Sequence, residues 1–146
     1  MQLGDKWEWT QHPDIFEWVQ TKIKQPMQLQ PNAQALVYRP ANGIAVAIYN
    51  SYAPQFESIG ISIAGEGNWA QRDAMATFVS VPFRMLPIYT LRCVVAKGNK
   101  KSRRLVEHVG FTLDGKIRKP WGSQKGDAMV YSMLRPEWEQ GKFNNG

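Results

Sequence analysis

The chain has 146 residues, of which 43% are hydrophobic and 21% charged, with a net charge of +6 and a single cysteine. This length suits one domain with one continuous core, and the longest apolar run, residues 43–49, is far shorter than the roughly 20 residues that a membrane helix needs. The first residues lack the apolar stretch of a secretory signal, and Cys93 cannot form an internal disulfide, so we expect a soluble cytoplasmic protein. The positive charge favours a partner rich in negative charge: nucleic acid, a phosphorylated cofactor or an acidic protein.

The first part of the chain predicts one helix and three strands. Residues 14–24 should form a helix that ends before Pro26, because Ile15, Val19 and Ile23 recur every fourth residue. Residues 34–38 and 43–50 are β-prone runs separated by turn residues, which predicts a hairpin. A third strand is expected over residues 58–63.

The second part of the chain alternates helices with strands. A helix is expected over residues 68–86, capped by Asn68 and kinked or divided by Pro82. A strand over 89–96, a helix over 100–109 that ends at Gly110, and strands over 112–118 and 128–134 should follow. This order predicts an α/β protein with a mixed sheet and helices on its faces. We expect a single domain over residues 1–140 and a loose tail over 141–146.

One helix begins with charges of the wrong sign. Residues 99–104 read Asn-Lys-Lys-Ser-Arg-Arg, although the helix dipole disfavours cations in the first turn by about 0.3 to 1 kcal/mol each. This placement, directly after a strong strand, indicates an anion site made of helix amides and basic side chains, most naturally for phosphate. A merely solvated basic face is the alternative.

Two segments resemble a known superfamily. NKKSRRLVEHVGFTLDG at residues 99–115 and GDAMVYSMLRPEW at residues 126–138 are similar to the C-terminal half of the GNAT superfamily, the acyl-CoA-dependent N-acyltransferases. The resemblance is closest to the branch that acetylates ribosomal-protein N-termini and to acetyltransferase-like proteins of bacteriophages, which share a GEGxW stretch like residues 65–69. It covers residues 60–138, and it implies a central, mixed, mostly antiparallel sheet with helices on both faces.

The resemblance implies acetyl-CoA as cofactor and a set of residues that bind it. The cofactor would lie in a V between the strands at 58–63 and 89–96. Its pantetheine arm would bond the main chain of the first strand, its pyrophosphate would meet the following loop, and the next helix start would add contacts. The implied cofactor residues are Ile61, Ser62, Ile63, Gly67, Asn68, Trp69, Ala70, Gln71, Arg72, Asn99, Ser102 and Arg103.

The sequence departs from the family pattern at two places. The glycine expected near Gln71 or Arg72 is missing, which restricts the backbone where it should approach the pyrophosphate; Arg72 would either pair with a phosphate or fill the pocket. Val106 stands where many members have a tyrosine that protonates the leaving thiolate. Glu57 is then the candidate base, with Glu66 behind it, and Tyr131 is a candidate acid. Each of these side chains also has an ordinary structural explanation, as a surface carboxylate or a half-buried strand tyrosine.

Three functions follow in order of preference. The first is an N-acetyltransferase that transfers acetyl from acetyl-CoA to an amine on a protein or small molecule. The alternative is a catalytically silent bacteriophage protein of the GNAT fold that binds a host bacterial protein in the host cytoplasm. A nucleic-acid binder ranks last, because no recognisable motif supports it. No metal site is expected, since His12 and His108 are far apart and no cluster has ligand spacing. The protein could be a monomer or a dimer, and the acceptor is not encoded in any readable signature.

Overall fold

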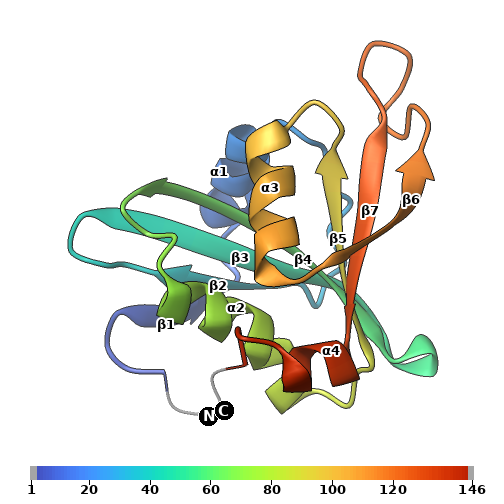
Figure 1. The fold of residues 1–146 in the computed structure, drawn as a ribbon. Coiled ribbons are helices and arrows are strands. Elements are labelled where there is room, and N and C mark those ends of the chain that lie inside the picture. The colour runs from blue at the N-terminus through green and yellow to red at the C-terminus, as the bar shows by residue number, and fades with distance from the viewer. Residues whose placement is uncertain (1–2, 145–146) are drawn as a thin grey trace.

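A computed structural model describes residues 3–144 and contains one seven-stranded sheet with helices on both faces (Figure 1). The strand order is β1-β2-β3-β4-β5-β7-β6, and every neighbouring pair is antiparallel except β4 and β5. The strands are β1 (Trp7–Thr10), β2 (Gln34–Tyr38), β3 (Gly43–Ala53), β4 (Ser58–Gly67), β5 (Thr90–Ala96), β6 (Thr112–Ile117) and β7 (Ala128–Leu134). The helices are α1 (Pro13–Ile23), α2 (Arg72–Met85), α3 (Lys100–Val109) and α4 (Arg135–Gln140), with a 3₁₀ turn η1 (Pro54–Phe56). The expected mixed, mostly antiparallel α/β architecture is confirmed.

The two faces of the sheet carry separate apolar cores. On one face, α1 packs its Val19 against side chains of β2, β3 and β4. On the other face, α2, α3 and α4 cover a larger core that includes Phe78, Leu91 and Tyr131. None of the helices within residues 3–144 combines the length and the apolar character that crossing a membrane requires.

Two elements escaped the sequence prediction. Strand β1 is only four residues long, and it adds to the edge of the sheet because Trp7 stacks on Tyr38 with ring centroids 4.3 Å apart. Helix α4 follows β7 directly; Pro136 occupies its first turn, and the Glu137 carboxylate accepts the main-chain amide of Leu134 at 2.8 Å. The remaining strands and helices lie where the sequence predicts them, within a few residues.

Helix α2 begins later than predicted. Its N-cap is Gln71 rather than Asn68, because the amide of Asn68 instead donates to the carbonyl of Asn42 in the β2–β3 turn at 2.8 Å. The helix also runs through Pro82 as one element rather than as two pieces. Residues 68–71 therefore form a loop that the β2–β3 turn holds in place.

The C-terminal segment is packed over its described part. Phe143 is only 6% exposed, its carbonyl accepts the Ser80 hydroxyl at 3.2 Å, and Arg84 donates to the Asn144 side chain at 3.1 Å. The expected loose tail is therefore wrong for residues 141–144, since an aromatic side chain anchors them to α2; residues 145 and 146 lie outside the described part.

The functional feature of the sheet is the divergence of its two parallel strands. Pairing of β4 with β5 covers only Ser58–Gly60 against Thr90–Arg92. Beyond these residues β4 continues along β3 to Gly67 and β5 continues along β7 to Ala96. The two parts of the sheet therefore diverge, and β4 and β5 form the two arms of a V (Figure 1).

Candidate active site

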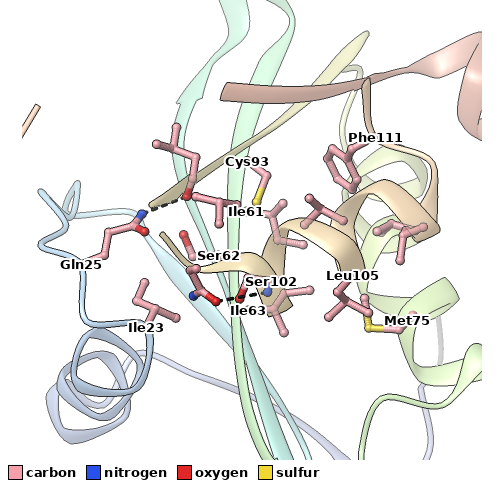
Figure 2. A pocket seen from close by; sticks show the side chains of 16 residues that line it. Ile23, Gln25, Ile61, Ser62, Ile63, Met75, Cys93, Ser102, Leu105 and Phe111 are labelled. Atoms are coloured by element: carbon pink, nitrogen blue, oxygen red, sulfur yellow. Dashed lines mark hydrogen bonds between the residues drawn. The ribbon is translucent and has the colours of Figure 1, made fainter. Parts of the chain in front are cut away.

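A narrow apolar cavity occupies the V on the side of α3 (Figure 2). Its volume is about 50 Å³, far less than the roughly 300 to 1,000 Å³ of a typical small-molecule pocket. The lining side chains come from β4, β5, α2, α3 and the end of α1, and they include Ile61, Ile63, Met75, Cys93, Ser102, Leu105, Val106, Val109 and Phe111. We call this space the wedge cavity.

The wedge exposes one edge of β4. From Ile61 onward, β4 bonds β3 on one side and has no strand on the other within residues 3–144. Unpaired peptide groups at a strand edge are ready hydrogen-bonding partners for another amide-bearing chain. Ile61, Ser62 and Ile63, which the sequence analysis assigned to the pantetheine arm, all line the wedge cavity.

Gln25 spans the mouth of the V. It follows α1, it is 8% exposed, and its side-chain amide donates to the main-chain carbonyl of Val94 on β5 at 2.9 Å (Figure 2). The main-chain carbonyl of Val94, where β5 has diverged from β4, therefore accepts a hydrogen bond from a side chain of the segment that follows α1. Sequence reasoning missed Gln25, because an isolated glutamine before a proline carries no local signal.

A larger, open cleft lies on the other side of the V. Its volume is about 730 Å³, and it shares Gln25, Ile61, Ser62 and Val94 with the wedge cavity. The rest of its lining comes from the segment after α1, the ends of β3 and β4, and the β6–β7 loop: Pro26, Met27, Gln28, Gln30, Asn50, Ser51, Ser58, Ile59, Gly60, Arg92, Pro120 and Trp121. We call it the outer cleft. The V thus connects two spaces across the sheet.

The start of α3 uses most of its amides internally. Asn99 caps the helix as predicted, its side-chain oxygen accepting the Ser102 amide at 3.2 Å. The amides of Lys100 and Arg103 also donate within the chain, to Gly98 and Asn99 carbonyls. What this helix start can offer an anion is therefore mainly its exposed lysine side chains and its dipole.

Arg103 points away from that anion site. Its guanidinium donates to the Tyr131 hydroxyl and to the Lys97 carbonyl, both at 3.2 Å. The Tyr131 hydroxyl in turn donates to the Glu107 carboxylate at 2.6 Å. Burial, followed by this bond to Glu107, raises the pKa of Tyr131. Arg103 and Tyr131 therefore form a structural network beneath α3 and do not line either space of the V.

Three main-chain amides of the loop between β4 and α2 are also hydrogen-bonded within the chain. Those of Asn68, Trp69 and Gln71 donate to carbonyls of Asn42, Gly67 and Trp69. The first three amides of α2, from Arg72 to Ala74, have no carbonyl to reach within the helix, and no side chain caps them among the described residues. Within residues 3–144, these amides at the start of α2 are therefore free donors next to the V.

Two side chains, one in this loop and one at the start of α2, have their contacts elsewhere. Arg72 donates to the Lys142 carbonyl and lies over the Phe143 ring, with 5.9 Å from the guanidinium carbon to the ring centroid. Trp69 lies against Gly65 so closely that a side chain there would collide with its indole. The structure therefore places neither side chain in the wedge cavity.

No carboxylate of residues 3–144 lines the V. Glu57 is exposed at the turn before β4, where its carbonyl accepts the amides of Tyr89 and Thr90, and Glu66 pairs with Lys22. Neither side chain is part of the wedge cavity or of the outer cleft. Within residues 3–144, no three His, Cys, Asp or Glu side chains are placed to hold a metal ion.

The comparison with known proteins bears on the fold. No family model matches the chain. YdaF of Bacillus subtilis, named as a candidate ribosomal N-acetyltransferase, is 32% identical over 89 residues, which are 60% of this chain and 44% of that protein. The chain therefore matches less than half the length of this relative.

Solved structures extend the likeness over most of the chain. RimL, a ribosomal-protein α-N-acetyltransferase solved with coenzyme A, superposes with a TM-score of 0.60 at 17% identity, covering 70% of this chain and 62% of that one. A mutant of SpeG, the spermidine N-acetyltransferase of Vibrio cholerae, superposes with a TM-score of 0.63 at 17% identity, covering 90% and 78%. The fold is that of the GNAT N-acyltransferases. The resemblance inferred from residues 60–138 is confirmed at this level.

Some of the residues that the resemblance implied lie together in the structure, and others do not. The splayed strands, the β4 edge at residues 61–63, Asn99 and Ser102 all meet at the wedge cavity. Neither space is lined by the other implied residues, which are the loop at residues 67–72, Arg103, Glu57 and Tyr131. The missed residues are Gln25 and Arg92, which line the outer cleft from segments that carry no family motif.

Proposed function

We propose that the chain is an acetyl-CoA-dependent N-acetyltransferase that acts on an amine of a protein or a small molecule. The observation that carries this proposal is the unpaired edge of β4 in the V, where one narrow space meets a second, wider one across the sheet. Such an opening lets a carrier and an acceptor approach one another from opposite faces. The GNAT fold and the resemblance to YdaF agree with this assignment.

The chain offers donors suited to each part of the carrier. Peptide groups at residues 61–63 suit the two amides of a pantetheine arm, and the free amides at the start of α2 suit phosphates, because a helix N-terminus attracts anions. Exposed Lys100, Lys101 and Arg104 at the start of α3 add positive charge nearby. When bound, the cofactor supplies an acetyl group activated as a thioester. The wedge cavity, at about 50 Å³, must widen to admit the arm.

The residues of the V act by position and by hydrogen bonding. An amide of the β4 edge can stabilise negative charge on the carbonyl oxygen of the acyl group, and alignment of the amine accounts for much of the rate. Because none of residues 3–144 brings a carboxylate to either space, we assign the proton of the amine to water of the open outer cleft. The proposal therefore assigns no catalytic role to Glu57 or Tyr131.

Acetyl-CoA binding tests the proposal directly. Acetyl-CoA at one hundred times its dissociation constant should stabilise the protein by about 2.7 kcal/mol, visible as a rise in the thermal midpoint. Ser102→Phe, which fills the wedge cavity, should abolish the shift, whereas Thr112→Phe on the exposed face of β6 should not. Circular dichroism checks that both variants fold. A thermal midpoint unmoved by saturating acetyl-CoA would refute the proposal.

The tight wedge cavity also favours a second candidate. A cavity of about 50 Å³, Val106 in place of a proton donor and committed loop amides suit a silent GNAT-fold protein of a bacteriophage that binds a host protein in the cytoplasm. This candidate predicts no shift with acetyl-CoA and one stoichiometric protein recovered from bacterial lysate. Release of thiol from acetyl-CoA in the presence of an amine would exclude it.

A further inference from the structure

The outer cleft carries a positive charge, which a bound acceptor of opposite charge would neutralise. Among the described residues that line it, Arg92 is the one that carries a charge. Its guanidinium has no ion pair or hydrogen bond with any residue from 3 to 144. The other polar groups are neutral amides and hydroxyls, and Asn50 is already engaged with the main chain at Gln28 and Gln30. A free cation thus faces a cleft to which the described part of the chain brings no compensating carboxylate.

We propose that the acceptor carries a carboxylate close to its reactive amine, and that Arg92 binds this carboxylate. This inference rests on the proposed function, because it concerns the acceptor side of the same V. A planar guanidinium binds a carboxylate through two parallel hydrogen bonds, which also fixes the orientation of the bound molecule. A polycationic amine would instead meet an unneutralised positive charge.

The register of the sheet puts Arg92 next to the opening. Arg92 pairs with Gly60 at the last position where β4 and β5 are bonded. Successive side chains of a strand point to opposite faces, so Cys93 lines the wedge cavity while Arg92 lines the outer cleft. A carboxylate held by Arg92 would therefore leave an adjacent amine close to the V.

The remainder of the lining suits a small polar molecule. Trp121 and Pro120, from the β6–β7 loop, and Met27 provide apolar surface for the carbon skeleton of the acceptor. Adjacent to Gln25 and Pro26, a shallow depression adds Lys24 and Lys125, with Glu17 as its one acid. The balance of charge around this side of the V is thus positive.

Matched product analogues test the preference for a carboxylate. Binding of N-acetylalanine, N-acetylalaninamide and spermidine to the full chain can be followed by ligand-detected NMR and Trp fluorescence. A charge-assisted bond of this type should favour the acid over the amide by about 10- to 100-fold. Arg92→Gln should remove that difference, whereas Arg39→Gln, which directly follows β2 and does not line the cleft, should preserve it.

Turnover distinguishes the source of the carboxylate. Thiol release from acetyl-CoA in the presence of free alanine would indicate that the acceptor is an amino acid. Thiol release with Ala-Glu-Glu amide, but not with Ala-Gln-Gln amide or free alanine, would indicate an acidic peptide N-terminus. Equal binding of acid and amide, no effect of Arg92→Gln, preference for spermidine, or no binding at all would overturn the inference. Acetyl-CoA titration of the same samples reports separately on the proposed function, because its failure would leave the acid–amide comparison intact.

Discussion

The hydroxyl of Tyr49 donates a 2.6 Å hydrogen bond to the main-chain carbonyl of Phe78. In a regular helix that carbonyl would accept the amide of residue 82, but Pro82 has no amide hydrogen. Both Tyr49 and Phe78 are buried, so water cannot replace the missing donor. A strand residue therefore completes the hydrogen bonding of α2, which explains why the helix continues through its proline.

Tyr49→Phe should destabilise the fold by about 1 to 3 kcal/mol, because it leaves a buried carbonyl without a donor. Urea denaturation of the wild type and the variant measures the difference. Tyr52→Phe is the matched control, since the Tyr52 hydroxyl has no partner among the described residues and lies in a half-buried strand position. Equal stability of Tyr49→Phe and wild type would mean that α2 tolerates the unpaired carbonyl.

This contact shows where sequence reasoning stops. The periodicity of residues 72–85 and the cost of Pro82 could be read from the chain, and they predicted a kink or a break. The donor that rescues the helix comes from β3, 29 positions earlier, and such a pairing appears only once the sheet is assembled. Local pattern therefore located most strands and helices to within a few residues, but it could not foresee long-range compensation.

Phe143→Ala should destabilise the protein by about 3 kcal/mol, because it empties a buried aromatic site. Phe56, 74% exposed in η1, provides the control: Phe56→Ala should change stability by less than about 0.5 kcal/mol. Thermal or urea unfolding of both variants checks the comparison. A mild effect of Phe143→Ala would restore the loose tail that the sequence suggested.

Burial raises the pKa of the Cys93 thiol from 9.0 to about 12. The folded state thus holds this proton more tightly than the unfolded state, so the stabilisation is complete below pH 9 and is lost as the pH rises toward 12. Between pH 9 and 11 the wild type should lose stability more steeply than Cys93→Ala, by up to about 1.4 kcal/mol per pH unit. Urea denaturation across that range, with reductant present, measures both slopes; parallel slopes would show that the thiol ionises normally in the fold.

For the candidate site, as for the fold, local features could be predicted from the sequence and long-range contacts could not. Asn99, Ser102 and the β4 edge were predictable, because a helix cap and a strand end lie in contiguous sequence. The direction of Arg72 and Arg103 was not, since their partners are Phe143 and Tyr131, far along the chain. Basic residues near a helix start thus predicted an anion site, but the sequence left open which side chains are free to serve it.

Gln25→Ala should both destabilise the protein and alter the V. Removing the side-chain amide leaves the Val94 carbonyl of β5 without its donor, at a cost of about 1 to 3 kcal/mol. It also removes the side chain shared by the wedge cavity and the outer cleft, so acetyl-CoA should bind with a changed affinity. Gln28→Ala is the control, because that side chain lines only the outer cleft and makes no hydrogen bond within residues 3–144.

Gln25→Glu separates the two effects of that substitution. It keeps the length of the side chain but replaces its donor with a carboxylate, which would face the Val94 carbonyl unfavourably. If the hydrogen bond holds the V in shape, Gln25→Glu should be at least as damaging to stability as Gln25→Ala, and raising the acidity of the buffer should recover part of the loss by protonating the new carboxyl group. Urea denaturation at pH 5 and pH 8 measures this recovery. A Glu variant as stable as the wild type at pH 8 would show that the Val94 carbonyl finds another donor and that Gln25 does not maintain the opening between β4 and β5.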